Sequence, residues 1–535
     1  MRPHPDWARA GRGALAGVLA GAVAVGVGQL VAGLISPGAS PVVAVGQLQI
    51  DFTPPALKNF AIRAFGSYDK QILVGGILVV LALFAAALGV LAARRLAYGL
   101  AGLGVFAAIG VTAAATRPAA TPAGVLPALA AAAAAAAALP VLIRAATRPG
   151  TAPRQASPAG QPPPPGSPAP AAPAPAPAGP PPGRRRFLIV SGAAAGAAAA
   201  GVLAGRALAG RFSVAGAQAA LRLPAPAHPV PALPAEADLR IAGLSPFVTS
   251  NAAFYRVDTA IVLPQVAPGS WMLRIHGLVR REVTVSFGQL IRRPLTEDYI
   301  TICCVSNPVA GPYIGNARWL GASLASLLRQ AGIRPGADQL LCTSADGFTS
   351  GVPVQAVLDG RDALLAVAMN GAALPIAHGF PVRMVVPGLY GYVSACKWIT
   401  DIEVTTYAAN TAYWARRGWD AQAPIKTESR IDVPADGSTV PAGRTTVAGV
   451  AWAQHKGIDA VQVRADRGPW QQARLAAVPG IDTWRQWAWP WQATPGSHLI
   501  EARATDATGY TQTPAHAPPA PNGATGYPAI TITVR

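Results

Sequence analysis

Cysteine, histidine and acidic side chains are all scarce in this chain. Its 535 residues include four cysteines and seven histidines, and 24 Asp and Glu stand against 43 Lys and Arg. Four cysteines in so long a chain do not make a disulfide scaffold, and the lack of a C-x-x-C or C-x-x-C-H pattern argues against a covalently attached c-type haem. The first 227 residues contain one histidine, His4, so this part has no histidine pair to bind haem b.

The positive charge is concentrated in the N-terminal part of the chain. Residues 1–235 carry 18 Lys and Arg against 3 Asp and Glu, so +15 of the formal net charge of +19 lies there and +4 in the remainder. These basic residues flank apolar segments, as expected for membrane topology. We therefore expect a membrane as a partner and no nucleic acid.

Long apolar runs are the main feature of residues 1–148. Four stretches cover about residues 12–35, 71–93, 96–116 and 124–143. Each is close to the roughly 20 residues that a helix needs to cross the hydrocarbon core, and each is almost free of charge. We predict a transmembrane region of about four helices.

Arginine clusters between these runs predict their orientation. The clusters are Arg2, Arg9 and Arg12; Arg94 and Arg95; and Arg144, Arg148 and Arg154. All belong on the cytoplasmic side by the positive-inside rule, whereas Lys58, Arg63 and Lys70 would lie outside as a partial exception. An even number of crossings returns the chain to the cytoplasm.

A Pro/Ala-rich linker at residues 149–183 leads to a second basic and apolar segment at 184–210. Arg184-Arg185-Arg186-Phe187-Leu188 matches a twin-arginine export pattern, and the following run is long enough for a fifth transmembrane helix. An ordinary basic flank to such a helix is the alternative. Either way the rest of the chain lies outside the cytoplasm, beginning with a proline-rich tether at 211–244.

Unusual side chains and glycines gather between Tyr299 and Ile399. Ile300–Cys304 is predicted to be a buried strand broken by Ser306-Asn307-Pro308, which places a thiol at the end of a rigid element. His378, Arg383 and Lys397 follow among glycine-rich turns. A thiol followed by basic side chains and glycines favours a metal site beside a binding site for a phosphate-bearing cofactor.

Several spaced motifs in this region resemble the molybdenum-cofactor domain of the sulfite oxidase family. They are Cys304-Val305-Ser306-Asn307, Gly315-Asn316-Ala317-Arg318-Trp319-Leu320-Gly321, Asp346-Gly347-Phe348-Thr349, Met369-Asn370-Gly371, His378-Gly379-Phe380-Pro381-Val382-Arg383 and Lys397-Trp398. The resemblance implies an α+β molybdopterin-binding domain at residues 245–426 and molybdenum-molybdopterin as cofactor. Within it, the residue patterns predict a strand at Trp271–Gly277 and helices at Phe287–Ile291 and Ser323–Ala331.

The resemblance also implies roles for individual residues. Cys304 would be the thiolate on molybdenum, and the pterin and its phosphate would be held by His378, Arg383 and Lys397. Two further residues, Asn316 and Arg318, would line the same pocket. Arg256, in Phe254-Tyr255-Arg256-Val257-Asp258, would face the metal or the substrate oxyanion; a surface or salt-bridged arginine is the alternative.

Other cysteines and one aromatic residue complete this interpretation. Cys303 would point away from Cys304 into the core. We also expect Cys342 and Cys396 in the core, with a disulfide between them left open. Phe348 stands where animal and plant members place a tyrosine near the metal, which puts sulfite itself in question; Tyr390 or Tyr392 is a candidate replacement.

Short strands at regular spacing predict an immunoglobulin-like β-sandwich at residues 427–535. The expected strands are Thr445–Ala451, Ala460–Ala465, Trp484–Trp489, His498–Thr505 and Ala529–Val534. In the family this domain commonly mediates dimerisation, so a homodimer is expected.

Together these features predict a membrane-anchored, multi-pass protein with an extracytoplasmic molybdenum oxidoreductase domain. It would transfer an oxygen atom to or from a small oxo-anion such as sulfite, and a separate carrier would exchange the electrons. One alternative is a reductase of S- or N-oxides such as methionine sulfoxide. The other is a binding module that kept the scaffold without the cofactor.

Overall fold

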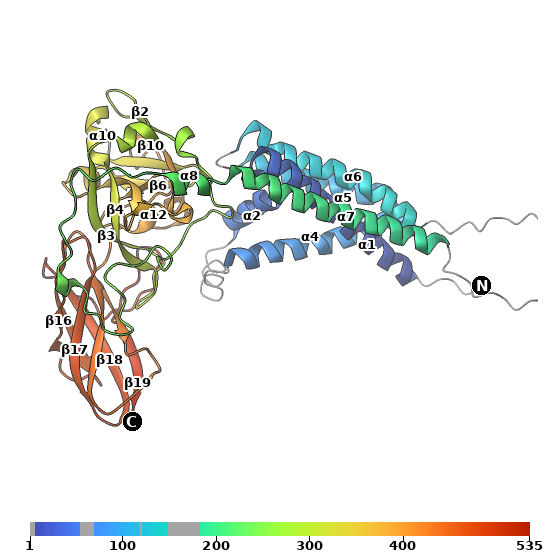
Figure 1. Ribbon diagram of the computed structural model, residues 1–535. Coiled ribbons are helices and arrows are strands. Elements are labelled where there is room, and N and C mark those ends of the chain that lie inside the picture. The colour runs from blue at the N-terminus through green and yellow to red at the C-terminus, as the bar shows by residue number, and fades with distance from the viewer. Residues whose placement is uncertain (1–5, 54–68, 118–119, 148–181) are drawn as a thin grey trace, which may run out of the picture. The chain divides into compact units, whose positions relative to one another are not determined.

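The computed structural model describes residues 6–53, 69–117, 120–147 and 182–535. They belong to two compact units, Met1–Ser213 and Val214–Arg535 (Figure 1). Nearly all of the expected linker at 149–183 lies outside the described residues, as do Arg2, Lys58, Arg63, Arg148 and Arg154.

The first unit is helical in its described residues. Its helices are α1 (Asp6–Ile35), α2 (Pro41–Phe52), α4 (Asp69–Arg94), α5 (Leu96–Ala115), α6 (Leu126–Thr147) and α7 (Pro182–Ala209), with short 3₁₀ turns at Pro37–Ala39, Pro122–Val125 and Gly210–Phe212. Five segments are long and apolar enough to cross a membrane: Arg9–Ile35, Ile72–Arg94, Leu96–Ala115, Pro122–Thr147 and Arg185–Ala220. The predicted apolar helices are thus present, and the shorter α2 was not predicted.

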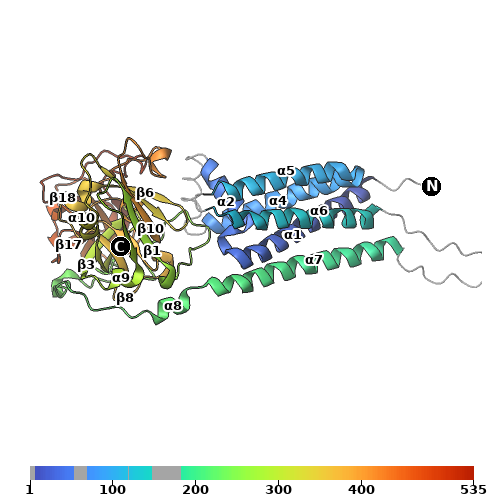
Figure 2. The same cartoon turned by 90° about the horizontal axis from the view of Figure 1, so that it is seen from above.

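Glycine allows close approach between helices of this unit. A Cβ atom at Gly17 of α1 would lie 1.9 Å from the Ala85 carbonyl oxygen of α4, and one at Gly33 would lie 2.4 Å from the Gly205 carbonyl oxygen of α7. Helix α1 therefore packs backbone to backbone against both neighbours, as small residues permit in lipid (Figure 2).

The second unit begins with α8 (Ala215–Ala220) and then forms one mixed sheet and one antiparallel sheet, with short helices. One sheet has the order β2 (Val283–Ser286), β1 (Met272–Gly277), β10 (Ile399–Thr405), β5 (Gln339–Ser344), β6 (Thr349–Pro353). The other has the order β3 (Leu295–Cys303), β4 (Ile314–Ser323), β7 (Leu364–Met369), β8 (Ala372–Ala373), with β9 (Arg383–Val385) also paired to β7. The helices are α9 (Phe287–Ile291), α10 (Leu324–Ala331), α11 (Val354–Leu358) and α12 (Gly391–Ser394).

Local signals account for several of these boundaries. Helix α10 begins after Ser323, whose hydroxyl accepts from the Ser326 N–H at 3.2 Å, and ends at Gly332 with φ +71°. The hairpin between β7 and β8 turns at Asn370 and Gly371, both with positive φ. The strand and helices predicted near residues 271, 287 and 323 are confirmed within one residue.

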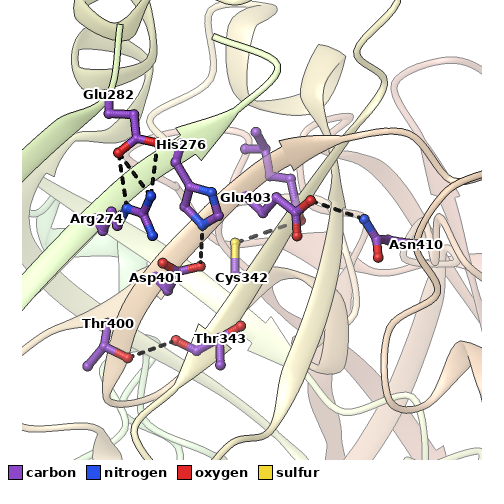
Figure 3. Close-up of polar contacts among 10 residues, drawn as sticks. Arg274, His276, Glu282, Cys342, Thr343, Thr400, Asp401, Glu403 and Asn410 are labelled. Carbon is purple, nitrogen blue, oxygen red and sulfur yellow. Dashed lines mark hydrogen bonds and ion pairs between the residues drawn. The ribbon is translucent and has the colours of Figure 1, made fainter.

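Polar pairs cover part of the first sheet (Figure 3). Arg274 on β1 binds Glu282 at 2.9 Å, and Nε2 of His276 lies 3.0 Å from a carboxylate oxygen of Asp401 on β10. Beneath them, the Cys342 thiol lies 3.8 Å from the Leu340 carbonyl oxygen. All four cysteines are free and buried, and Cys303, Cys342 and Cys396 belong to the main hydrophobic core, as predicted.

Two further sheets are formed by the C-terminal residues (Figure 1). Their orders are β11 (Glu428–Val433), β13 (Gly443–Trp452), β17 (Arg485–Ala493), β16 (Arg474–Leu475), and β12 (Thr439–Val440), β19 (Ala529–Val534), β18 (Gly496–Asp506), β14 (Ile458–Ala465), β15 (Gln471–Gln472). A separate core that includes Val447, Val461, Trp487 and Ile532 is built from both sheets. All five predicted strands are present.

Segments that connect the C-terminal strands are bonded directly to strand β3 through Thr301. The Thr301 N–H donates to the Asp482 carbonyl at 2.9 Å, and its carbonyl accepts from Gln454 Nε2 at 3.1 Å. The Thr301 hydroxyl accepts from the Trp484 N–H at 2.7 Å. This strand, which leads to Cys304, is therefore supported by residues about 150 to 180 positions later in the chain.

Candidate active site

Cys304 is the first residue after strand β3, in a turn that is bonded on both sides. Its N–H donates to the Tyr313 carbonyl at 2.9 Å, and its carbonyl accepts from the Asn307 N–H at 3.0 Å. The Asn307 side chain closes the turn by accepting from the Tyr313 N–H at 2.8 Å. The structure thus places a thiol at the end of a rigid strand.

The environment of the Cys304 thiol favours its neutral form. Burial raises its pKa, and hydrogen bonds from Ser306 and the positive charge of Lys397 oppose that rise. Only 7% of Cys304 is exposed, and the adjacent Cys303 is fully buried in the main core. A thiolate at this position requires a further positive charge, such as a bound metal, to hold it deprotonated.

The structure brings His378, Arg383 and Lys397 together around Gly379. The Arg383 guanidinium donates to the His378 carbonyl at 3.2 Å. A Cβ atom at Gly379 would lie 2.9 Å from Arg383 Cβ and 3.2 Å from Lys397 Cα, and φ of Gly379 is +109°. Glycine is required here because any side chain would occupy the space between these residues.

Burial and mutual repulsion change the charge of this cluster. Burial, with Arg383 and Lys397 nearby, lowers the pKa of His378 to about 4, so its imidazole is neutral at neutral pH. Burial lowers the pKa of Lys397 to about 8 and that of Arg383 to about 10. These three residues therefore provide two cations and one neutral imidazole.

Arg383 provides the clearest indication that this cluster binds an anion. Its guanidinium lies over the Trp319 ring at 4.9 Å, and its buried Nε has no hydrogen-bond partner among the described residues. A buried charged donor without a partner is costly unless a ligand satisfies it. A phosphate oxygen fits that donor, so the residues present suit a phosphate-bearing cofactor.

A buried carboxylate joins Lys397 to Arg256. Oδ2 of Asp258 lies 2.7 Å from Lys397 Nζ and 2.8 Å from Arg256 Nε. The side chain of Asp258 is 4% exposed, and that of Arg256 is 39% exposed. Arg256 thus forms the ion pair that the sequence interpretation considered as its alternative.

Asn316 and Arg318 lie on the other face of strand β4 from Trp319. Side chains alternate along a strand, and Trp319 is the residue that contacts Arg383. Asn316 donates to the Phe247 carbonyl at 2.9 Å and accepts from the Thr301 hydroxyl at 3.0 Å. Arg318 pairs with Glu297 at 3.4 Å. The structure does not bring these two residues to the cation cluster, contrary to the expectation from sequence.

Tyr255 is a residue of this site that the sequence interpretation missed. Its ring stacks on Phe254, which in turn contacts the rings of His378 and Trp319. A Cβ atom at Gly391 would lie 3.6 Å from the Tyr255 hydroxyl and 3.5 Å from the Cys303 carbonyl oxygen. Burial and the nearby Cys304 raise the pKa of this phenol well above its usual value. Its position next to Arg256 in the recognised motif was the available signal.

Phe348 packs in an aromatic group beside a small cavity. Its ring lies 5.7 Å from that of Tyr413. The cavity, about 90 Å³, is lined by residues that include Tyr392, Tyr407, Asn410, Trp414 and Asp420. The Tyr392 hydroxyl donates to the Asp420 carbonyl, and Tyr390 is buried.

Comparison with known proteins supplies the class of this molecule. Residues 260–414 match the family described as "Oxidoreductase molybdopterin binding domain". The chain is 31% identical over 296 residues to sulfite oxidase of Gallus gallus, which covers 46% of this chain and 63% of that protein. It is 32% identical over 149 residues to the uncharacterized oxidoreductase YuiH of Bacillus subtilis (strain 168), covering 28% of this chain and 72% of YuiH.

Among solved structures, the sulfane dehydrogenase SoxCD of Paracoccus pantotrophus aligns with a TM-score of 0.45 and 24% identity, over 50% of this chain and 75% of that chain. The molecule described here is an oxidoreductase with a molybdopterin-binding domain. More particularly, the chain belongs to the sulfite oxidase family, and its cofactor is molybdenum-molybdopterin. That result replaces the alternative of a cofactor-free binding module. The chain spans less than two thirds of the length of the chicken relative.

Proposed function

We propose that this protein is a membrane-anchored oxidoreductase that transfers an oxygen atom to or from a small oxo-anion such as sulfite. The chicken relative is named sulfite oxidase, which supports this substrate class. The cofactor supplies the two-electron redox chemistry, and the protein supplies binding, orientation and electrostatic stabilisation. The observation that carries the proposal is the unpartnered Nε of buried Arg383 in the cluster with His378 and Lys397.

In this proposal each residue of the site has a separate task. Cys304 binds the metal as a thiolate, because a soft sulfur ligand suits molybdenum and the turn fixes its position. Arg383 and Lys397 bind the cofactor phosphate, and neutral His378 donates a hydrogen bond to the pterin end. Arg256, which is joined to Lys397 through Asp258 and is 39% exposed, draws the anionic substrate toward the site.

Substrate choice depends on the hydroxyl donors that face the site. Phe348 cannot donate a hydrogen bond, and the Tyr392 hydroxyl is bonded to the Asp420 carbonyl. Tyr255, whose ring stacks on Phe254, has its hydroxyl close to Gly391 and is the candidate phenol donor of the site. Reduction of S- or N-oxides is the second candidate activity, because the aromatic wall of Phe348 and Tyr413 suits a less polar substrate.

The helical unit anchors the enzyme in a membrane, and the catalytic domain lies outside the cytoplasm. Five helices long and apolar enough to cross a bilayer support the anchor. The arginines beside these helices support a cytoplasmic location for the helix ends that carry them. The run Arg184–Leu188 supports twin-arginine export, which moves a folded protein with its cofactor in place.

We propose six segments for this chain. They are a transmembrane region at 1–148, a linker at 149–183, a fifth helix or export signal at 184–210, a tether at 211–244, the molybdopterin-binding domain at 245–426 and a C-terminal domain at 427–535. The last segment is an immunoglobulin-like domain that forms a homodimer, supported by two sheets around a common core. A separate electron carrier completes the reaction. That carrier is supported by the scarcity of histidine in the first 227 residues, where only His4 occurs.

The direct test is metal analysis of the full chain and of Cys304→Ser. We expect wild type to contain about one molybdenum per chain, and the variant to lose dye-linked turnover because an alcohol ligates the metal poorly at neutral pH. Cys303→Ala is the matched control, since that thiol lies in the core. Turnover retained by Cys304→Ser would refute the site.

The same preparations decide between the two activities. Sulfite oxidation with a dye acceptor and sulfoxide reduction with a dye donor are measured on wild type. Sulfite oxidation should be the faster reaction; a chain that only reduces sulfoxides would move the assignment to the second candidate.

A further inference from the structure

Asp258 is the most buried carboxylate in contact with the cation cluster. Its side chain is 4% exposed, and a single oxygen, Oδ2, accepts from both Lys397 Nζ at 2.7 Å and Arg256 Nε at 2.8 Å. Both distances are typical of strong charge-assisted hydrogen bonds. The pair with Lys397 is largely shielded from water, because the lysine side chain is only 11% exposed.

The Lys397 ammonium is held from three directions. It donates to Asp258, approaches the Ala377 carbonyl at 3.4 Å, and lies 4.9 Å from the centre of the Trp398 ring. Two of its three N–H groups are directed at Asp258 and Ala377, which leaves one for a ligand. Asp258 therefore fixes where that remaining donor points.

The other charged groups around Lys397 are repulsive. Arg383 and Arg256 both oppose its positive charge, and Asp258 is the acid that compensates it. His378 is neutral at neutral pH, and burial raises the pKa of the nearby Cys304 and Cys396 thiols, so these groups add no negative charge beside Lys397. A buried ammonium that loses its counter-ion releases its proton or moves toward water.

We propose that Asp258 is a positioning residue for the cofactor: it keeps Lys397 charged and directs its free N–H at the cofactor phosphate. This rests on the proposed function, in which Lys397 binds that phosphate. The exposed Arg256 donates to the same oxygen at 2.8 Å and adds a second positive charge beside the carboxylate. Arg256, Asp258 and Lys397 thus form a chain of ion pairs that leads from the exposed Arg256 to the lysine that binds the phosphate.

An aspartate has a specific advantage over an asparagine at this position. Asparagine keeps the shape and can accept one hydrogen bond, but it carries no charge to offset a buried lysine. Loss of one hydrogen bond to a charged group changes an equilibrium constant by roughly tenfold to hundredfold. We therefore expect Asp258→Asn to release the cofactor at least about tenfold faster than wild type.

The test measures cofactor retention by the full chain rather than activity. Purified Asp258→Asn, Asp258→Glu, Arg256→Gln and Lys397→Met are compared with wild type for molybdenum per chain and for the rate at which fluorescent pterin is released. Asp258→Glu, which keeps the charge, should lie between wild type and Asp258→Asn. Arg256→Gln should have a smaller effect than Asp258→Asn, because it leaves the Lys397 pair in place.

A double variant separates positioning from simple loss of fold. If Asp258 acts through Lys397, Asp258→Asn combined with Lys397→Met should release pterin no faster than Lys397→Met alone, and its Tm should exceed that of Asp258→Asn because no buried ammonium is left unpaired. This result is expected even if Asp258→Asn alone is unstable. Additive effects on pterin release would overturn the inference.

The phosphate-binding role of Lys397 and the positioning role of Asp258 can be tested separately. If Lys397→Met loses pterin quickly while Asp258→Asn retains it like wild type, Asp258 has no positioning role and the phosphate clamp stands. If Lys397→Met retains the cofactor like wild type, the clamp itself is refuted, and the inference about Asp258 falls with it.

Discussion

The buried carboxylate of Glu428 should make the stability of this protein fall as pH rises. Glu428 begins strand β11, is 4% exposed, and its Oε1 has no hydrogen-bond partner among the described residues. Burial raises its pKa from 4.5 to about 8, although the positive charge of Lys426 opposes the rise. The folded protein therefore holds this proton in a pH range where the unfolded chain has released it.

The sign and size of the effect follow from proton linkage. Between about pH 4.5 and 8 the folded state binds more protons than the unfolded state, so each pH unit destabilises it by about 1.4 kcal/mol through this group. From about pH 5 to pH 7.5 the loss is roughly 3 kcal/mol, which corresponds to a change in Tm on the order of 5 °C. Glu428→Gln keeps the shape and removes the titration.

The assay is thermal unfolding of wild type and Glu428→Gln across this pH range. The difference in Tm, variant minus wild type, should grow as pH rises. Asp298, whose pKa burial raises to about 7, adds a slope of the same sign to both proteins and cancels in the difference. Glu282→Gln is the control, because Glu282 is 57% exposed and paired with Arg274. Parallel Tm curves for Glu428→Gln and wild type would refute the reasoning.

Two further predictions concern the geometry of the site. Gly379→Ala should lower both Tm and molybdenum content, because its Cβ would lie 2.9 Å from Arg383 Cβ; Gly360→Ala, at φ +105° with open space around it, should lower Tm alone. If the two variants bind the same amount of molybdenum, steric crowding at Gly379 does not affect cofactor binding. Asn316→Ala should lower Tm by several degrees, because it removes the acceptor of the Thr301 hydroxyl and one of two side-chain donors to the Phe247 carbonyl, the other being Trp484 Nε1. The folded fraction should keep its cofactor, as metal analysis would show. Loss of cofactor from folded Asn316→Ala would place that residue in the site after all.

The cluster at the centre of the site was predictable because local signals define it. Ser306-Asn307-Pro308 breaks a buried strand directly after Cys304, and the glycine at 379 permits the approach of Arg383 and Lys397. The apolar helices were equally clear, since their length and lack of charge need no tertiary context. Each of these features depends on residues close together in the sequence.

Features that depend on distant neighbours were not predictable. Asn316 and Arg318 occur in a recognised motif, but the register of β4 turns them away from Trp319 and Arg383. The neutral state of His378 depends on its burial beside two cations. Asp258 is 139 residues from Lys397, and no spacing rule relates the two positions.

The three bonds between Thr301 and the segments that connect the C-terminal strands have an evolutionary consequence. Because Asp482, Gln454 and Trp484 bond to Thr301, near the end of the strand that leads to Cys304, a recombination event that exchanged the last hundred residues between distant homologues would disturb the proposed metal ligand itself. The molybdopterin-binding domain and the C-terminal domain should therefore be inherited together. Substitutions at this contact should co-vary among related sequences.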